Sequence, residues 1–329
     1  MKNHQIVIDT KAILTLLAVL ASVWVASQTK TIIIALFIAL IIAFGLNPAV
    51  EFLLKKGLPR NVSVILIYFA FLIVVFGIGA LAVTPMVNQS IALANNFPKY
   101  LENLSKIPEL APYTQNLNTK ITEQLSNIGT KALQTTVGAF SGVLLSLTIL
   151  VFTAYLLIDF VNIKKYFIKL IPKSGRKDAE DITEEVEIKL GHWLRGQITL
   201  MLIIGIMSYI GLLILGVNYA PSLALIAGLL EMVPIVGPII SVIPALIVGF
   251  GQSPIQGIGV IGLYIIVQQL ENNFIVPKVM QKAVGFNPLI TMLAILIGGS
   301  VLGVVGALIA VPVTLVSTII LKVVYKHLY

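Results

Sequence analysis

We predict that this 329-residue chain is an all-α, polytopic integral membrane protein with about seven to eight transmembrane helices. The first observation is composition: 58% of the residues are hydrophobic and 11% are charged, whereas soluble domains have about 25% charged residues. The second is a series of apolar runs close to the roughly 20 residues that span a bilayer. The third is that Pro and Gly interrupt the two longest runs. These observations exclude a disordered protein, a soluble enzyme and a nucleic-acid-binding module.

Most of the apolar runs have the length of a single helix. The first two are short and nearly contiguous, so they predict either two full crossings or a tilted, partly re-entrant hairpin over residues 12–47. The predicted single helices cover residues 12–27, 31–47, 62–83, 137–160 and 193–217, with a shorter one at 257–270.

Two runs, residues 221–250 and 288–321, are too long for one crossing. As a straight helix, the second would extend about 50 Å, against a hydrocarbon core of about 30 Å. Both contain residues that interrupt helices, because Pro lacks a backbone donor and clashes with the preceding turn. We therefore predict that each run forms a Pro/Gly-broken helical hairpin or a discontinuous helix. The breaks are expected around Pro234, Gly237 and Pro238 in the first run, and around Gly303, Gly306 and Pro312 in the second.

The chain has a net charge of +8, and the positions of its basic residues predict its orientation in the membrane. Lys and Arg gather in the loops 50–60, 161–196 and 271–287 and in the C-terminal tail. All four segments fall on one side if both long runs return to the side they left. Because cytoplasmic loops are rich in Lys and Arg, we expect a multi-pass protein of the cell membrane (inner or plasma membrane) with both termini in the cytoplasm.

The predicted topology divides the chain into five parts. They are N-terminal transmembrane helices (1–83), an extracytoplasmic amphipathic helical segment (84–136), a transmembrane helix (137–160), a cytoplasmic helical loop (161–192) and a C-terminal transmembrane core with discontinuous helices (193–329). Each polar segment carries one apolar helical face, which we expect to pack on the membrane domain or on a neighbouring subunit. These faces comprise Leu117, Ile121, Leu125 and Ile128, and Ile182, Val186, Leu190 and Trp193.

Glu231 is the main candidate for a functional residue. It is the only charged residue between Leu200 and Leu270, and a charge at bilayer depth costs about 2.5–3.5 kcal/mol on insertion scales. It immediately precedes the break at Pro234, where unpaired carbonyls and half-helix ends can bind a cation or a polar solute. The alternative is structural: Glu231 caps backbone groups or pairs with Arg195.

A second polar cluster, QQLENNFIVPK, begins at Gln268. At 100° per residue, Gln268, Glu271 and Asn272 share one helical face, which would line a polar cavity. The alternative is an interfacial helix end before the turn at Pro277. The sequence leaves both interpretations open.

These blocks, with EMVPIVGPIISVIPA and GFNPLITMLAILIGGSVLGVVGALIAVPV, resemble the autoinducer-2 exporter (AI-2E) family of membrane proteins. The resemblance implies a transporter: family members are described as exporters of a quorum-sensing signal, and some as sodium/proton antiporters. It also suggests a homo-oligomer, with a pentamer as the expected form. The residues that match the family pattern are Glu231, Pro234, Gly237, Gln268, Glu271, Asn272, Pro277, Pro288, Gly303, Gly306 and Pro312.

Three functions follow as hypotheses. The leading one is export or facilitated passage of a small polar solute, bound by Glu231, Gln268 and Asn272. The second is sodium(lithium)/proton antiport, against which stands the lack of an acidic neighbour for Glu231. The third is a non-transporting oligomeric membrane scaffold. No enzyme activity, cofactor or metal is expected, because the chain has no Cys and its three histidines are far apart.

Overall fold

The computed structural model describes residues 27–77, 144–280 and 288–328, together with residues 17, 21, 22, 24, 25 and 102. The secondary structure of these parts is helical, without a strand, which confirms the predicted all-α class. Most of the predicted first helix and nearly all of the segment 84–136, including its apolar face, lie outside the described residues.

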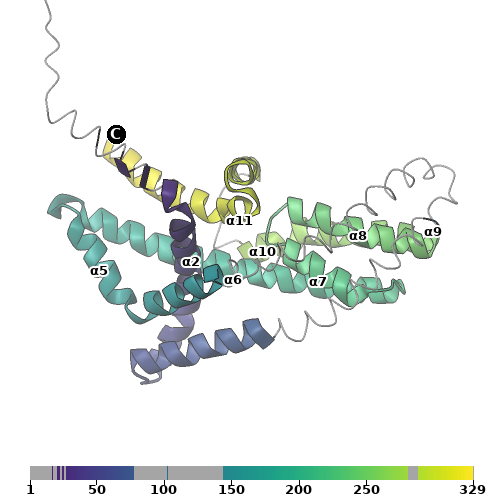
Figure 1. The fold of residues 1–329 in the computed structure, drawn as a ribbon, viewed down its shortest axis with the longest axis horizontal. Coiled ribbons are helices and arrows are strands. Elements are labelled where there is room, and N and C mark those ends of the chain that lie inside the picture. Colours follow the sequence, from purple (N-terminus) through teal and green to yellow (C-terminus); the bar gives the residue numbers. More distant parts are fainter. Residues whose placement is uncertain are drawn as a thin grey trace, which may run out of the picture.

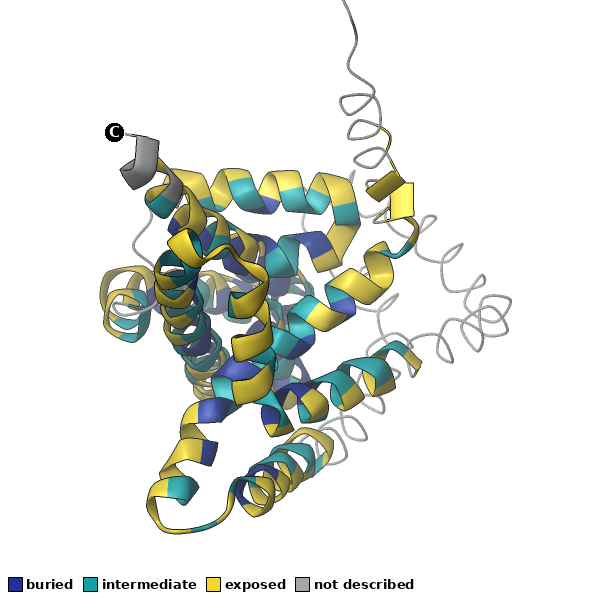
Figure 2. Ribbon diagram, turned by 90° about the vertical axis from the view of Figure 1, so that its left-hand side faces the viewer, coloured by how far each residue is buried: buried dark blue, intermediate teal, exposed yellow. Residues whose placement is uncertain are grey.

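The described helices fit a polytopic membrane protein. Five are long and apolar enough to cross a membrane, and a sixth candidate is the bent pair Leu144–Ile158 and Phe160–Leu170. Figure 2 shows buried residues toward the middle of the molecule and exposed residues on the outer helix faces. Many of the exposed side chains are large and apolar, as expected for surfaces that contact lipid. The five candidates are Lys30–Lys55, Arg60–Gly77, Lys173–Ile214, Pro254–Met280 and Leu289–Val323.

Helix α6 (Arg176–Ile214) organises the fold. It joins the predicted cytoplasmic loop and the predicted span at 193–217 into one helix, because no Pro interrupts it. It contacts α2, α5, α7, α9, α10 and α11. Its predicted apolar face packs as expected: Val186, Leu190 and Trp193 lie in a buried cluster with residues of α2 and α11.

Helix α2 (Lys30–Lys55) runs across α6 near the middle of the molecule (Figure 1). Small residues allow the two helices to approach closely. A Cβ atom on Gly191 of α6 would lie 2.7 Å from the carbonyl oxygen of Phe44. A Cβ atom on Gly45 of α2 would lie 2.5 Å from Cδ2 of Leu194.

The run from 221 to 250 forms the predicted broken hairpin. Helix α7 (Ala220–Leu230) ends just before Glu231, and α8 (Val236–Gln252) begins after a short irregular turn. Helix α9 (Pro254–Leu270) returns beside α8. Figure 1 shows α7, α8 and α9 alongside the C-terminal half of α6. Their contacts bury a second apolar core around Leu212, Leu223 and Val260.

Helix α9 does not end at the polar cluster. It continues through a π-helical turn (Glu271–Ile275) into α10 (Val276–Met280). Pro277 has no N–H to donate to the preceding turn, and the wider π turn lies just before it. The polar residues therefore lie within a 27-residue helical unit.

Helix α11 (Pro288–Leu328) consists of two arms. The break falls at Gly303, whose φ of 62° and ψ of −143° are accessible almost only to Gly. Gly306 and Pro312 lie in the second arm, within helical turns. The backbones of the two arms lie close together: a Cβ atom on Gly298 would lie 2.4 Å from the carbonyl oxygen of Gly306.

Candidate functional site

A cavity of about 740 Å³ lies where α6, the α7–α8 break, the end of α9 and α11 meet. It brings together residues from both polar sequence clusters, which are about forty positions apart along the chain. Its lining residues are Trp193, Gln197, Leu200, Glu231, Pro234, Ile235, Ile239, Gln268, Glu271, Asn272, Val276, Pro277, Met280, Thr291 and Val311.

Glu231 is almost fully buried, with 2% of its surface exposed. Its backbone carbonyl accepts a 2.7 Å hydrogen bond from Nε2 of Gln197. Its side-chain Oε2 has no hydrogen-bond partner among the described residues. No salt bridge joins Glu231 to Arg195 in the described part of the chain; Nη1 of Arg195 donates instead to the carbonyl oxygen of Gly45 at 3.1 Å.

Glu271 is the acidic neighbour that Glu231 lacks in the local sequence. It opens the π-helical turn, lines the same cavity and is 5% exposed. The two carboxylates interact electrostatically. Oε2 of Glu271 also lacks a hydrogen-bond partner in the described part of the chain. The lack of an acidic neighbour for Glu231 therefore no longer argues against a cation site, because Glu271 of the other polar cluster lines the same cavity.

The remaining polar cluster divides between two surfaces. Gln268 and Asn272 line the cavity, and Nε2 of Gln268 donates to Oδ1 of Asn272 at 3.3 Å. Gln269 and Asn273 are not among the lining residues and bond to each other at 2.9 Å. The interpretation of Gln268, Glu271 and Asn272 as one cavity-lining face agrees with this geometry.

Sequence reasoning missed Gln197. This amide is 1% exposed in an apolar part of α6, and its Oε1 has no hydrogen-bond partner among the residues described. An isolated Gln in a predicted span is the signal that would have found it. With Gln197, three cavity residues each hold one buried oxygen without a donor.

The predicted break residues have different positions. Pro234 lines the cavity, whereas Gly237 and Pro238 are not among its lining residues. A Cβ atom on Gly237 would lie 1.9 Å from the carbonyl oxygen of Leu230, so Gly237 lets the two arms of the hairpin meet. Pro238 lies at the start of α8, where its carbonyl accepts a 2.9 Å hydrogen bond from Oγ of Ser241.

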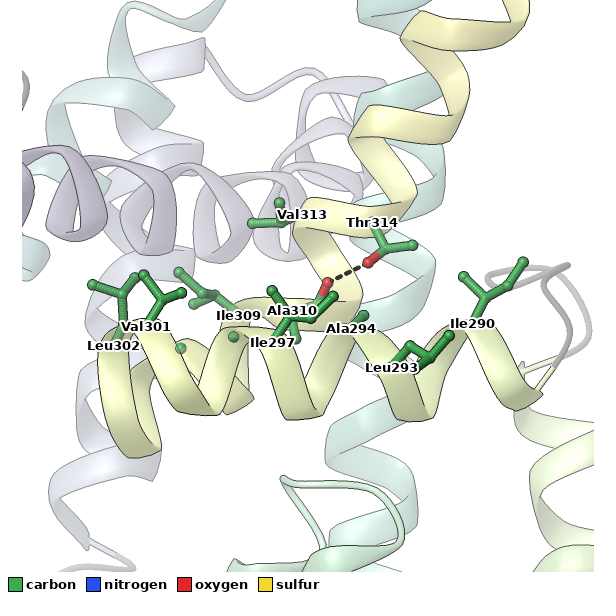
Figure 3. Close-up of a pocket in the computed structure, with 12 residues that line it drawn as sticks. Ile290, Leu293, Ala294, Ile297, Val301, Leu302, Ile309, Ala310, Val313 and Thr314 are labelled. Carbon is green, nitrogen blue, oxygen red and sulfur yellow. Dashed lines mark hydrogen bonds between the residues drawn. The ribbon is translucent and has the colours of Figure 1, made fainter. Parts of the chain in front are cut away.

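The α11 hairpin borders a separate cavity of about 470 Å³ (Figure 3). Gly306 lines it, but Gly303 and Pro312 do not. The figure shows apolar side chains from both arms facing this space, and the hydroxyl of Thr314 is occupied by a 2.8 Å bond to the carbonyl of Ala310. This lining offers nothing for a charged or strongly polar ligand.

A strained turn borders the polar cavity. Ile235 has φ 70° and ψ −52°, and the N–H of Val236 donates to the carbonyl of Pro234 at 2.8 Å. This is a γ-turn with positive φ, which is the rare and strained form. Such a conformation in a β-branched residue costs about 1–3 kcal/mol. The chain therefore stores backbone strain at the wall of the cavity.

We expect Ile235→Gly to leave the protein more stable than Ile235→Ala by about 1 kcal/mol, because only Gly relieves the positive φ. Ile239 provides the control, since it also lines the cavity but lies inside α8. There the order should reverse, with Gly less stable than Ala by about 0.5–1 kcal/mol. Thermal unfolding of the four purified variants measures both differences. The same order at both positions would contradict the strained turn.

A third cavity, of about 340 Å³, includes Arg195 and lies between α2, α5 and α6. Here Nδ2 of Asn47 donates to Glu51 at 3.1 Å and to Glu187 at 2.9 Å. Lys164 lies 3.6 Å from Glu187. These contacts join three helices through charged and polar groups. In the part of the chain that the structure describes, no three His, Cys, Asp or Glu side chains gather as metal ligands.

Comparisons with known proteins identify a family of transporters. The family model described as "AI-2E family transporter" matches residues 13–326. The "Putative transport protein YrrI" of Bacillus subtilis (strain 168) is 31% identical over 313 residues, covering 91% of this chain and 87% of the relative. The "Putative transport protein YhhT" of Escherichia coli (strain K12) is 28% identical, with coverage of 93% and 87%.

A third relative carries a more specific name. The "Sodium-lithium/proton antiporter" of Halobacillus andaensis is 27% identical over 296 residues, which cover 83% of this chain and 84% of that protein. The family match extends over nearly the whole chain and includes each element that forms the polar cavity. The chain belongs to the AI-2E family of transporters.

Proposed function

We propose that this protein is a secondary transporter of a small polar solute and that the cavity bordered by Glu231 and Glu271 is its transport site. One observation carries the proposal: Gln197, Glu231 and Glu271 line one cavity, and each holds a buried side-chain oxygen without a hydrogen-bond partner among the described residues. A buried acceptor without a partner costs about 1–3 kcal/mol. A solute rich in hydroxyl or amino groups would satisfy these acceptors, so a polyhydroxylated signal such as autoinducer-2 is a suitable first test.

The surroundings of the cavity also support transport. Its wall contains the broken hairpin α7–α8, and interrupted helices are a recurring feature of transport sites. A volume of about 740 Å³ has room for a small organic solute. The turn at Ile235, with its positive φ, places backbone strain in one wall of the cavity, as often seen at functional sites.

Sodium(lithium)/proton antiport is the second candidate. It is favoured by the two neighbouring buried carboxylates and by the name of the Halobacillus andaensis relative. In this mechanism the pair would alternate between binding a proton and binding a monovalent cation. The amide oxygen of Gln197 would complete the set of oxygen ligands.

The cellular setting is part of the proposal. The distribution of Lys and Arg supports a cell-membrane protein with both termini in the cytoplasm. Export of the solute and assembly into a homo-oligomer follow from the family resemblance. Cross-linking in native membranes measures the oligomer, and flux in sealed vesicles measures the direction.

We expect Glu231→Gln and Glu271→Gln each to reduce transport at least about tenfold, a loss equivalent to about 1.4 kcal/mol. Purified protein in sealed liposomes would be tested with labelled polar solutes, including autoinducer-2, with and without sodium and proton gradients. Glu180→Gln is the matched control, because Glu180 is exposed on α6 and does not line the cavity. This control should transport at the unmodified rate.

The outcomes separate the candidates. Solute flux that requires both carboxylates supports the leading proposal, and sodium-dependent proton movement without solute flux supports antiport. Normal flux in both Gln variants, at equal amounts of folded protein, would remove the carboxylates from the mechanism. Folded protein that moves neither solute nor ion would support the scaffold hypothesis instead.

A further inference from the structure

Helix α5 (Phe160–Leu170) leaves a membrane helix at a sharp angle. It follows Leu144–Ile158 after a single residue and is bent from it by 82°. In Figure 1, α5 lies at the end of the molecule opposite α8 and α9. A helix that turns through nearly a right angle at the end of a span runs along the membrane surface rather than across it. The alternative, a broken span, would place three lysines in the hydrocarbon core, which is costly.

The surface of α5 has two kinds of exposed side chain. Tyr166, Phe167 and Leu170 are 66%, 66% and 81% exposed, and their spacing of three and four positions places them on one face. Lys165 and Lys169 are also exposed, on the neighbouring face. The Nζ of Lys169 lies 5.9 Å from the ring centre of Tyr166, so the basic edge and the apolar face meet.

The local charge is strongly positive. Residues 159–177 contain six Lys or Arg and one acidic residue, Asp159. Two of the basic groups are engaged inside the protein: Lys164 pairs with Glu187, and Arg176 donates to the carbonyl oxygens of Lys169 and Ile171. Among the described residues, no salt bridge engages Lys165, Lys169 or Lys173. These three charges remain available to an external partner.

Contacts with the protein fix the orientation of α5. The ring of Phe160 packs edge-on against Phe44 of α2, with centroids 5.6 Å apart. Lys164 ties the same side of the helix to α6. The side with Tyr166 and Leu170 therefore faces outward as a fixed surface. No residue of α5 is buried by the described chain.

We propose that α5 is an interfacial helix that binds the anionic lipid headgroups of the surrounding bilayer. Aromatic and aliphatic side chains on one face, with lysines beside them, are the pattern of helices that lie in the headgroup region. Tyr166, Phe167 and Leu170 enter the acyl boundary, and Lys165, Lys169 and Lys173 contact phosphates. The continuity of α5 with a membrane helix places this surface at the required depth. The inference rests on the membrane topology and does not depend on the transported solute.

The chain contains no Cys, so a single introduced cysteine can carry a polarity-sensitive fluorophore. Full-length Leu170→Cys would be labelled and reconstituted in phosphatidylcholine vesicles and in vesicles that also contain anionic phosphatidylglycerol. We expect the emission to shift to shorter wavelength with the anionic lipid, and a quencher attached to lipid acyl chains to lower its intensity. Glu180→Cys is the control, because anionic headgroups repel its acidic surroundings; its emission should not depend on the lipid.

A second variant tests the charges separately. Adding Lys165→Gln, Lys169→Gln and Lys173→Gln to the labelled protein should remove the effect of anionic lipid, as should high salt, which screens exposed charges. These lysines are exposed, so the variant is expected to fold; unchanged elution on size exclusion checks this. Emission at position 170 that ignores lipid composition, or that resists the lipid-borne quencher, would overturn the proposal. A lipid effect of equal size at position 180 would overturn it as well.

Discussion

Gly237→Ala is expected to destabilise the protein and abolish transport. The new Cβ atom would lie 1.9 Å from the carbonyl oxygen of Leu230 and 3.1 Å from the backbone nitrogen of Glu231. Overpacking usually costs about 1–3 kcal/mol when side chains can adjust. Here the clash is with backbone, so the cost should reach the upper end of that range or exceed it. The α7–α8 hairpin must open, and Glu231 must move with it.

The measurement is thermal unfolding of the purified protein, combined with flux in liposomes. A loss of about 3 kcal/mol would lower the Tm by at least about 5 °C. Gly262→Ala is the matched control, because Gly262 lies within α9 and its Cβ would meet nothing within 4 Å. That change should be neutral or stabilising by about 0.5–1 kcal/mol. Equal Tm values for the two variants would show that the arms are not in close backbone contact.

Gly306→Ala should have a similarly large effect on the α11 hairpin. Its Cβ atom would lie 1.9 Å from the carbonyl oxygen of Gly298, and the reciprocal approach from Gly298 is also too close for a side chain. The arms that border the apolar cavity in Figure 3 would separate. We expect a loss of about 3 kcal/mol or more, for the same reason of backbone overpacking. Because the polar cavity also contacts α11 at Thr291 and Val311, transport should fall as well.

Gly299→Ala distinguishes this crossing from a general intolerance of side chains. A Cβ atom there would meet only the Cβ of Ala307, at the ordinary contact distance of 3.9 Å. Its Tm and flux should remain close to those of the unmodified protein. If Gly306→Ala unfolds at the same temperature as Gly299→Ala, the close crossing of the two arms is refuted.

For the two broken hairpins, the sequence predicts that each long apolar run is interrupted but does not locate the interruption to the residue. Both were predictable from length, because a helix much longer than the bilayer is thick must turn back or leave it. The position of the break was harder. Gly303 is the non-helical residue of α11, while Pro312 lies within its second arm. A Pro in a helix removes one hydrogen bond but need not end the helix, so composition alone does not locate the turn.

Helix boundaries show the same limit. The sequence predicts a helical cytoplasmic loop at 161–192 and a separate membrane helix at 193–217, whereas α6 continues from one into the other. Hydropathy indicates where a chain enters the lipid, whereas a helix ends only where a residue interrupts its backbone hydrogen bonds. The polar cluster at Gln268 likewise lies within a continuous helical unit, with a π turn before Pro277.

The sequence alone determined the membrane class, the broken hairpins and the candidate residues, because hydrophobic length and the cost of an intramembrane charge are local properties. Only the tertiary structure decided which polar groups share a cavity. It placed Glu271 beside Glu231, added Gln197, and turned Arg195 toward α2 instead. The physical reason is that pairing across forty residues depends on how α6, α9 and the α7–α8 break pack, and that packing is set by contacts between whole helices.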